Sequence, residues 1–499
     1  MRFFNYTQVV LAVCLHLIAT ACARPQHGGA TTQAPAGPRI THGIAAGEVT
    51  TTSAVIWARC EHAADLHVAI DGAPASQETT APALAGNDFT AQVTLEGLEP
   101  ATPYSYRAWC VDSTDSAAVG DAVSGTFRTA PPADSPQAVR FVWGGDVGGQ
   151  NACRDRSEGY PIFHRIFDQH AHFFIGLGDM VYVDDPCLVT GRYGNQQIPG
   201  PSNVATDLPA FWAYWKYNRE ELATQRVLAS TSYYAVWDDH EVINDFGPQR
   251  DTGPSPPYPP GLHLLPLGRQ AFLDYNPLAA AAPRLYRRIR WGPHLDLFVL
   301  DTRSYRDPND RPDDPRHPKT MLGGEQLRWL KDGLLHSDAT WKVIVSSVPL
   351  SVQTCLGEHG CDGWGRFDGR TGFAYELLDI LRFMHAHNIR NHIWISTDIH
   401  FVAAVRYRPF RDDPTFQFYE VDTGPLNAGV FPKNEWELDT TLNPTLLFRY
   451  PDDADPSRGY AAARSWFNFG VMRVDEHGSA RIAVINTDGT TLFELSLEQ

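Results

Sequence analysis

Short hydrophobic runs that end abruptly in acidic residues are the main pattern in this chain. The run 234–237 is followed at once by Asp238, Asp239 and His240, and Asn244 comes shortly after. This pattern is typical of a buried strand that delivers ligands, because ligands in open α/β sheets bind at the C-terminal ends of strands. A single run of this kind fits a solvated turn equally well, since Asp and Asn are common turn residues.

Repetition of the pattern favours the functional interpretation. Hydrophobic runs end in aspartate at five places along the chain, namely Asp146, Asp179, Asp238 with Asp239, Asp301 and Asp398. A further run, 343–350, has the same hydrophobic pattern and ends without an ionisable side chain. Carboxylates gathered with a few imidazoles predict a metal site built mainly from hard oxygen ligands.

Segments with hydrophobic residues at helical spacing lie between these runs, at 162–170, 208–228, 325–335 and 375–387. Alternating strands and helices predict a layered α/β fold for residues 138–499. Two stretches rich in Pro, Gly and charged residues, 251–264 and 307–319, are expected to be long irregular loops. The aromatic cluster at 211–217 fits helix packing better than the lining of a substrate groove.

The first part of the chain has a different pattern. Residues 39–130 contain short alternating runs at 53–59, 66–70, 89–95 and 104–109, separated by turn residues. Regular short strands of this kind predict an N-terminal fibronectin/Ig-like β-sandwich. The segment 98–106 resembles the tyrosine corner of fibronectin type III domains, and the Pro-rich stretch 130–136 is expected to be a linker.

The N-terminus has the pattern of an export signal. The hydrophobic run 9–18 is too short for a spanning helix, which needs about 20 residues. It is followed by Ala19-Thr-Ala21, a small-residue cleavage site, and then by Cys22. We expect residues 1–22 to be an export signal, possible lipidation of Cys22, and a flexible tether over 23–38. The protein would then be periplasmic, anchored to the outer membrane as a lipoprotein, or secreted.

Charge and cysteine content refine this picture. Asp and Glu outnumber Lys and Arg by 58 to 41, for a net charge of −17, which opposes non-specific binding to nucleic acids. A small phosphate ester held by a metal stays compatible, because a bound metal dominates the local field. An even number of cysteines in an exported chain favours disulfides. Proximity in the sequence suggests three pairs beyond the signal: Cys60 with Cys110, Cys153 with Cys187, and Cys355 with Cys361.

The order of the motifs resembles that of the calcineurin-like metallophosphoesterases. Asp146-Val-Gly148 matches their first motif, and Gly178-Asp179 their second, in which the aspartate bridges two metals. Their third and last motifs correspond to residues 238–241 and 397–400, with carboxylates where relatives have neutral ligands. These departures, together with Leu-Asp301-Thr-Arg303 and the preceding sandwich, resemble the alkaline phosphatase D (PhoD) family.

This resemblance implies an exported phosphoesterase that uses iron and calcium and acts on a broad range of phosphomonoesters and phosphodiesters. One departure is Asp146, since bacterial members of the family carry a cysteine ligand in the first motif. Calcium, manganese, zinc and iron therefore stay open. The expected metal ligands are Asp146, Asp179, Tyr182, Asp239, Asn244, Asp398 and His400.

Several of these roles have alternatives. Tyr182 is either a ligand or a core residue, and Asn244 either a ligand or a phosphate contact. We expect His240 to donate a proton to the leaving group, with metal ligation as the alternative. We expect Arg303 to contact the phosphate through its planar fork, with an ion pair to Asp301 as the alternative.

Three functions remain in competition: a broad phosphomonoesterase and phosphodiesterase, a phospholipid- or nucleotide-directed phosphodiesterase with the same site, and a surface binding protein that has lost catalysis. A binding protein should have gaps among the ligands. All of the expected ligands are present, so the sequence favours an enzyme with a small phosphate ester as its substrate and no specific nucleic-acid partner.

Overall fold

The computed structural model describes residues 37–72, 78–248, 261–278, 284–354, 361–367, 370–431 and 438–497. The expected export signal, Cys22 and most of the expected tether lie outside the described residues, as does Cys355. Residues 36–499 form one compact unit. Within the described residues, no helix is both long enough and hydrophobic enough to cross a membrane.

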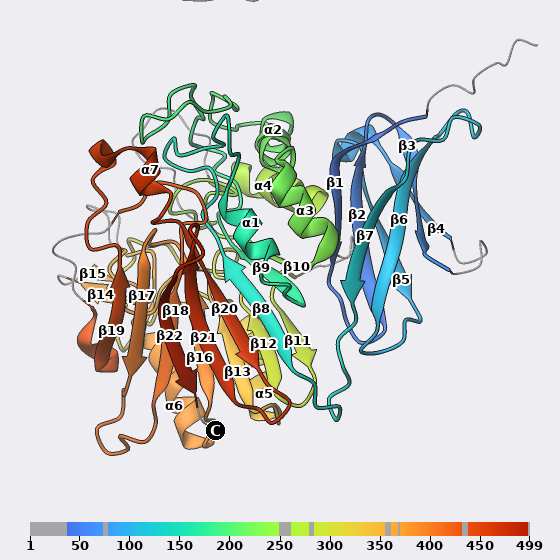
Figure 1. Ribbon diagram of the computed structural model, residues 1–499. Helices are drawn as coiled ribbons and strands as arrows, with labels where there is room; N and C mark the ends of the chain where they lie inside the picture. The colour runs from blue at the N-terminus through green and yellow to red at the C-terminus, as the bar shows by residue number, and fades with distance from the viewer. Residues whose placement is uncertain are drawn as a thin grey trace, which may run out of the picture. The chain divides into compact units, whose positions relative to one another are not determined.

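The expected β-sandwich is present near the N-terminus, drawn in blue in Figure 1. One sheet has the strands β1 (Ile40–Gly47), β2 (Ser53–Cys60) and β5 (Thr90–Glu96). The other has β4 (Thr79–Ala83), β3 (Ala64–Ile70), β6 (Pro103–Asp112) and β7 (Val123–Arg128). The Cys60–Cys110 disulfide joins the two sheets. The tyrosine corner is confirmed, since the Tyr104 hydroxyl accepts a hydrogen bond from the Glu99 N–H at 2.8 Å.

The sheet that contains β1 continues into the second part of the chain. Its nine strands run in the order β22-β21-β20-β8-β9-β10-β1-β2-β5. The strands not yet introduced are β8 (Val139–Gly144), β9 (Phe173–Leu177), β10 (Ser232–Val236), β20 (Asn468–Val474), β21 (Ala480–Asn486) and β22 (Thr491–Leu497). β10 joins β1 in parallel at Gly47 and Tyr233. Glycine is needed there, because a Cβ would lie 2.5 Å from the Tyr233 carbonyl oxygen.

A second large sheet has seven strands in the order β11-β12-β13-β16-β18-β17-β19. They are β11 (Arg287–Trp291), β12 (Leu295–Val299), β13 (Trp341–Val345), β16 (His392–Ser396), β17 (Val402–Tyr407), β18 (Phe418–Asp422) and β19 (Pro444–Tyr450). A short hairpin of β14 (Arg366–Phe367) and β15 (Arg370–Thr371) stands apart. The strands β12, β13, β16 and β18 are parallel, so their C-terminal ends share one edge.

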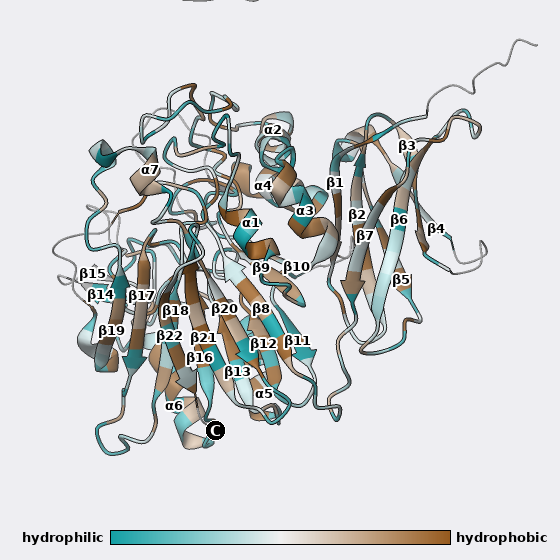
Figure 2. Cartoon of the chain, in the orientation of Figure 1, coloured by the Kyte–Doolittle hydropathy of each residue, from teal (hydrophilic) through white to brown (hydrophobic). Residues whose placement is uncertain are grey.

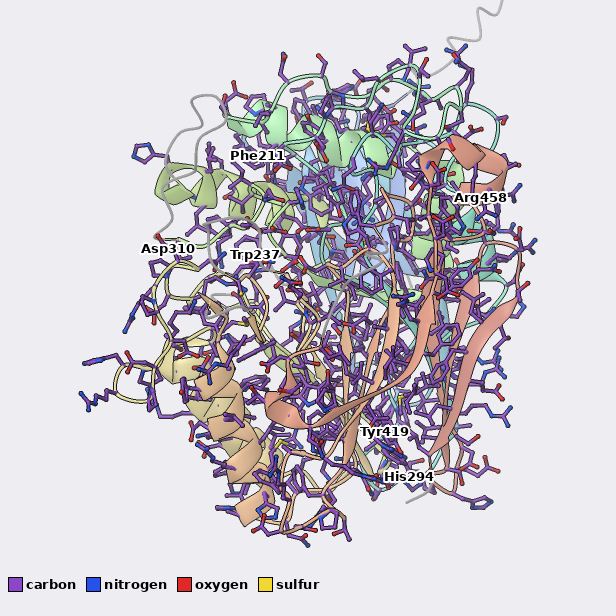
Figure 3. All side chains as sticks on the ribbon, turned by 90° about the vertical axis from the view of Figure 1, so that its left-hand side faces the viewer. Phe211, Trp237, His294, Asp310, Tyr419 and Arg458 are labelled. Atoms are coloured by element: carbon purple, nitrogen blue, oxygen red, sulfur yellow. A yellow bond between two sulfur atoms is a disulfide. The ribbon has the colours of Figure 1, made fainter. Side chains whose placement is uncertain are left out.

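Helices cover the outer faces of both large sheets. The helices are α1 (Ile162–Phe167), α2 (Leu208–Arg219), α3 (Leu222–Ser230), α4 (Gly261–Tyr275), α5 (Gly323–Leu335), α6 (Ala374–Ala386) and α7 (Tyr460–Ala463). Helices α1 to α4 pack on the nine-stranded sheet, and α5 and α6 on the seven-stranded sheet. A third hydrophobic core fills the space between the sheets. Hydrophobic residues follow the strands in Figure 2, and side chains fill the layers in Figure 3. The expected layered α/β fold is confirmed.

Two expectations about local structure were wrong. The segment 208–228 is not one helix but two, because the Glu221 carboxylate accepts hydrogen bonds from the backbone N–H groups of Ala223 and Thr224 and thereby starts α3. The last part of the expected loop 251–264 is helical, since α4 begins at Gly261 and buries Leu264 completely, while residues 251–260 lie outside the described residues. The aromatic residues of α2 pack in the core, as expected.

Candidate metal centre and active site

The ends of four strands supply the expected ligands. β8 leads into Asp146, β9 into Asp179 and β16 into Asp398 and His400, while β10 leads into Asp239. Four of these residues have positive φ angles, +63° for Asp146, +52° for Asp179, +76° for Asp398 and +59° for His400. Such conformations cost about 1–3 kcal/mol each and persist only where the surroundings enforce them. Their concentration at one place indicates a functional site.

Glu241 holds two of these strand ends together. Its Oε2 accepts hydrogen bonds from the backbone N–H groups of Asp238 at 2.8 Å and Asp179 at 3.2 Å, and its Oε1 accepts one from Met180 at 2.8 Å. The side chain is completely buried, and burial raises its pKa to about 8. The sequence shows Glu241 in the third motif, but not this role.

The acidic side chains form four overlapping groups, and within each group one ligand atom per residue lies within 4.8 Å of the others. The groups are Asp146, Asp179 and His400; Asp179, Asp239 and His240; Asp238, Asp239 and Asp398; and Asp239, Asp245 and Asp362. Asp179 belongs to two of them, as a bridging ligand should. Burial and neighbouring carboxylates raise the pKa values of Asp146, Asp179 and Asp398 well above the usual range.

Asp146 gives the clearest indication that cations fit here. It is fully buried, and neither of its carboxylate oxygens has a hydrogen-bond partner among the described residues. A side chain at Gly424 would collide with its Oδ2. A buried carboxylate without a partner is strongly unfavourable unless a cation balances its charge. The oxygen-rich donor set therefore fits metal cofactors.

His400 and Tyr182 lie beside Asp146. The Tyr182 hydroxyl is 2.8 Å from His400 Nε2, and this nitrogen is 3.8 Å from Asp146 Oδ1. His400 Nδ1 faces the Gly429 carbonyl oxygen, which can only accept a hydrogen bond, so Nδ1 carries the proton. Burial lowers the pKa of His400 to about 3. The lone pair of Nε2 therefore accepts the Tyr182 hydroxyl and lies beside Asp146. A metal bound there would take this lone pair in place of the hydroxyl.

His240 forms a pair with Asp184, a residue that the sequence analysis did not single out. His240 Nδ1 lies 2.6 Å from Asp184 Oδ1, and Asp184 Oδ2 accepts the Asn244 backbone N–H at 2.8 Å. Burial alone would lower the pKa of His240, but the carboxylates of Asp184, Asp239 and Asp179 raise it well above its usual value. The imidazole also packs against Tyr182, with ring centroids 4.2 Å apart and the ring planes tilted by 36°. The contact with Asp184 orients the His240 imidazole for proton donation. Because His240 also belongs to a candidate ligand group, metal ligation remains the alternative.

The structure surrounds the Arg303 guanidinium with carboxylates. Its side chain is completely buried, with Nε donating to Asp238 Oδ1 at 2.6 Å and Nη1 donating to Asp362 Oδ1 at 2.8 Å. Its Nη2 lies 2.7 Å from Asp362 Oδ2. The alternative ion pair between the Arg303 side chain and Asp301 is not among these contacts, and the expected phosphate contact remains a prediction. Arg303 lies behind the carboxylates and balances part of their charge.

Asp362 is a second residue whose role only the fold reveals. Besides Arg303, its carboxylate accepts hydrogen bonds from Arg306 Nη1 at 2.5 Å and Asn309 Nδ2 at 2.9 Å. Burial alone would raise the pKa of Asp362, but the two guanidinium groups lower it below the usual range. The preceding residue, Cys361, is disulfide-bonded, and its expected partner Cys355 lies outside the described residues.

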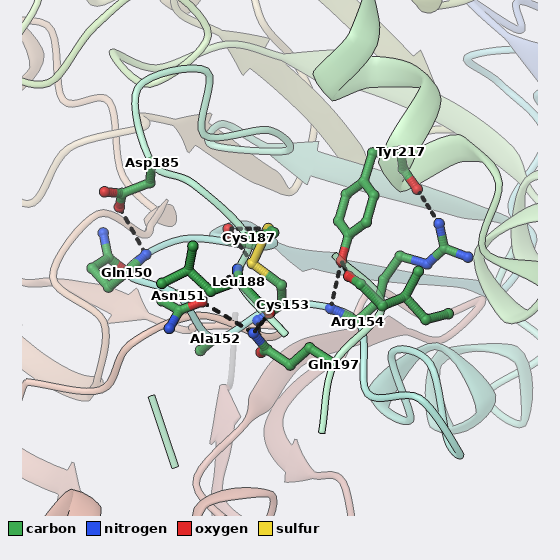
Figure 4. Close-up of a disulfide and its surroundings, with 12 residues drawn as sticks. Gln150, Asn151, Ala152, Cys153, Arg154, Asp185, Cys187, Leu188, Gln197 and Tyr217 are labelled. Carbon is green, nitrogen blue, oxygen red and sulfur yellow. Dashed lines mark hydrogen bonds between the residues drawn. A yellow bond between two sulfur atoms is a disulfide. The ribbon is translucent and has the colours of Figure 1, made fainter. Parts of the chain in front are cut away.

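The Cys153–Cys187 disulfide, shown in Figure 4, was correctly expected and links the two loops that carry the first two motifs. Beside it, the Gln150 N–H donates to Asp185 Oδ2 at 2.8 Å across the same two loops. Cys153 is therefore bonded to Cys187. It is not free to act as the cysteine ligand that the PhoD resemblance implies where this chain has Asp146.

A cavity of about 680 Å³ opens over the acidic groups. Asp179, Asp239, His240, Asp398 and His400 line its inner part. Exposed Asn244 also lines the cavity, and its expected role as a ligand or phosphate contact remains a prediction. The cavity is within the range of sites that bind small organic ligands.

Comparisons with known proteins agree with this geometry. The family model described as PhoD-like phosphatase matches residues 141–479, and that of its N-terminal domain matches residues 23–131. Alkaline phosphatase D of Bacillus subtilis (strain 168) is 25% identical over 350 residues, which cover 65% of this chain and 54% of that protein. The chain thus matches about half the length of this curated relative.

Two solved structures share the fold. A structure of PhoD aligns with a TM-score of 0.68 and 19% identity over 93% of each chain. The purple acid phosphatase PPD1 from yellow lupin seeds aligns with a TM-score of 0.55 and 12% identity, over 92% of this chain and 73% of that one. Because the catalytic family model covers well over half of the sequence, the chain belongs to the PhoD-like phosphatase family.

Proposed function

We propose that the protein is a metal-dependent phosphoesterase that hydrolyses phosphomonoesters and phosphodiesters. The observation that carries this proposal is the buried Asp146 carboxylate, which has no hydrogen-bond partner among the described residues and lies in one ligand group with Asp179 and His400. Cations bound there would make water nucleophilic at neutral pH and offset the negative charge of the phosphoryl group.

The residues of the chain have distinct tasks in this proposal. Asp146, Asp179, Asp239, Asp398 and His400 hold the cations. His240 donates a proton to the oxygen of the departing alcohol, and Asp184 orients its imidazole through the 2.6 Å contact. Positioned acids of this kind contribute about 10²–10⁴-fold to rates.

Calcium and ferric iron are the metals we favour, because the PhoD resemblance implies them and because a Tyr182 phenolate would suit ferric iron. The Tyr182 hydroxyl lies beside His400 Nε2, one of the expected ligand atoms. Burial and neighbouring carboxylates raise the pKa of Tyr182 well above its usual value, so its phenolate would form only with a bound cation. Manganese and zinc are the competing metals. Metal analysis of the purified protein, followed by reloading of the stripped protein with each ion, would separate these possibilities.

The test is hydrolysis of 4-nitrophenyl phosphate and bis(4-nitrophenyl) phosphate before and after chelation, with Ca²⁺, Fe³⁺, Mn²⁺ and Zn²⁺ added back separately. We expect chelation to abolish turnover and Asp179→Asn to prevent its recovery. Asp168→Asn, an exposed aspartate at the end of α1, is the control and should behave as the wild type. Absence of turnover with every metal would contradict the proposal, and a metal-free site would favour the binding protein.

The ratio of monoester to diester turnover would distinguish the broad enzyme from the alternative, a phosphodiesterase directed at phospholipids or nucleotides.

We also propose that the protein is exported, and that Cys22 anchors it to the membrane if it is lipidated. The two described disulfides support export, because disulfides persist in oxidising compartments. Labelling of cells with a radioactive fatty acid should mark the wild type and not Cys22→Ala. Recovery of unlabelled wild-type protein from the cytoplasm would contradict both parts of this proposal.

A further inference from the structure

Part of the cavity lining is hydrophobic. We call this part the apolar wall, and it is formed by Val352, Ile399, Phe401, Val430 and Phe431. It faces the same space as the ligand groups, so an organic group attached to a bound phosphate would meet it. Burial of hydrophobic surface contributes about 25 cal/mol per Å², which makes such a wall a source of specificity.

The apolar wall is fixed to the metal-binding residues by backbone and ring contacts. Ile399 and Phe401 flank His400 in the chain, and the Gly429 carbonyl oxygen accepts the His400 Nδ1–H. The next residue, Val430, donates its N–H to the Tyr193 hydroxyl at 2.9 Å.

Phe431 is the most accessible part of the wall. Its side chain is 37% exposed although it lines a cavity. Its ring centroid is 5.3 Å from that of His400, and the Arg192 guanidinium lies 4.7 Å from the ring centroid. These two contacts hold an aromatic ring next to the position expected for the reacting phosphate.

The cavity lining carries further negative charge. We call Asp453 and Asp455 the acidic edge, since both line the cavity apart from the ligand groups. Arg458 Nη1 lies 3.9 Å from Asp453 and offsets part of this charge. No lysine or arginine is among the described residues that line the cavity. Recognition of additional phosphates or carboxylates normally uses such cations.

We propose that this cavity selects phosphate esters whose organic group is apolar and carries no negative charge, such as aryl or alkyl esters. The inference rests on the proposed phosphoesterase function and specifies its substrate class. The apolar wall would bind the organic group, and the acidic edge would reject esters with a further anionic group.

The test uses diesters that share the 4-nitrophenolate leaving group, so that differences come from the other organic group. The second group is methyl, phenyl or 4-carboxyphenyl. We expect kcat/KM for the phenyl ester to exceed that for the methyl and the 4-carboxyphenyl ester by roughly 10-fold each, the equivalent of about 1.4 kcal/mol. The monoesters phenyl phosphate and 4-carboxyphenyl phosphate, followed by phosphate release, form a second pair.

Variants of the apolar wall and of the acidic edge test which surface causes each part of the substrate preference. Phe431→Ala should remove most of the preference for phenyl over methyl, whereas Leu335→Ala, which truncates an exposed leucine at the end of α5, should keep it. The double variant Asp453→Asn and Asp455→Asn should raise kcat/KM for the 4-carboxyphenyl ester relative to the phenyl ester. Asparagine at position 455 still caps the short helix over Pro456–Arg458.

Binding of phosphonates separates this inference from the proposed function. Calorimetry should give tighter binding of phenylphosphonate than of methylphosphonate or 4-carboxyphenylphosphonate to the metal-loaded protein. This order without ester hydrolysis would support the inference and contradict the proposed function. Hydrolysis without preference, or a preference that Phe431→Ala leaves unchanged, would overturn the inference.

Discussion

In the proposed mechanism, the contact between His240 and Asp184 orients the imidazole and favours its protonated form, which would donate to the leaving group. Asp184→Asn keeps the shape of the side chain and removes the charge that favours protonated His240. We expect kcat/KM to fall by about 10–100-fold for esters of poorly acidic alcohols, and much less for 4-nitrophenyl esters, which need little protonation. Steady-state kinetics on both ester types would measure the difference.

Asp185→Asn is the matched control, since its side chain still accepts the Gln150 N–H and it lies one residue further along the chain. An equal loss on both ester types, with a loss of bound metal, would instead make His240 a metal ligand.

His392 provides a prediction about stability. Its imidazole is buried between the rings of Phe416 and Phe418, and neither ring nitrogen has a hydrogen-bond partner among the described residues. Burial lowers its pKa to about 3 from 6.5. Between these values the unfolded chain binds more protons than the folded one, so stability from this residue is present above pH 6.5 and declines as the pH falls toward 3.

His392→Phe should remove this dependence. We expect its free energy of unfolding to exceed that of the wild type by a few kcal/mol at pH 4 and to lie close to it at pH 8. Urea denaturation at both pH values would measure this, with the exposed His317→Gln as the control. Equal differences at both pH values would show that packing, and not titration, determines the effect.

At the scale of elements, the loops after β8 and β9 carry the first two motifs and depend on one covalent link. The Cys153–Cys187 disulfide spans 34 positions, for which the chain-entropy relation gives roughly 3–4 kcal/mol of stabilisation. Its replacement by two alanines should destabilise the protein and also weaken metal binding, because Asp146 and Asp179 belong to the linked loops.

Chelator competition would measure metal affinity, and chemical denaturation would measure stability. The matched control is the double alanine variant of Cys60 and Cys110, whose disulfide lies within the sandwich. This control should lose stability without losing metal affinity. The same loss of affinity in both variants would contradict a local role for the Cys153–Cys187 link.

Hydrophobic runs predicted the central strands well, because strands buried on both faces need continuous hydrophobic sequence. The same reasoning missed the break between α2 and α3, where both helices keep a hydrophobic face. The cap at Glu221 decides that break, and hydrophobic periodicity carries no information about a cap.

At the scale of the whole molecule, the sandwich and the catalytic layers share a sheet. Besides the pairing of β1 with β10, Trp57 in β2 donates its indole N–H to the Asp274 carbonyl oxygen at 2.6 Å, and Arg219 lies over the Trp57 ring. Gln92 in β5 donates to the carbonyl oxygens of Leu273 and Asn276. We therefore expect the two parts to unfold together.

Calorimetry of the protein should show one cooperative transition, and Trp57→Ala should lower its midpoint as a whole through a loss of about 3–5 kcal/mol. The loss of catalytic activity and the red shift of tryptophan emission should have the same midpoint. The control is Trp109→Ala in β6, on the sheet of the sandwich that does not join the catalytic layers. Two separate transitions in the wild type would contradict the expectation.

The sequence by itself determined the chemistry of the strand ends. Asp146, Asp179, Asp239, Asp398 and His400 could be named as ligands because each follows a hydrophobic run, and such a run fixes both a buried strand and its end. Two of the expected disulfides followed from an even number of cysteines and their proximity in the sequence. The choice of these ligands depends only on residues that are adjacent in the sequence.

Only the tertiary structure decided which side chains meet. Arg303 binds Asp238 and Asp362, His240 pairs with Asp184, and β1 joins β10. Each of these pairs brings together segments at least 50 residues apart, and their order along the chain does not indicate which loops converge. The sandwich sheet joins the catalytic sheet edge to edge, and the two large sheets pack face to face. This packing decides which side chains meet, so the sequence predicts the carboxylates but not their contacts.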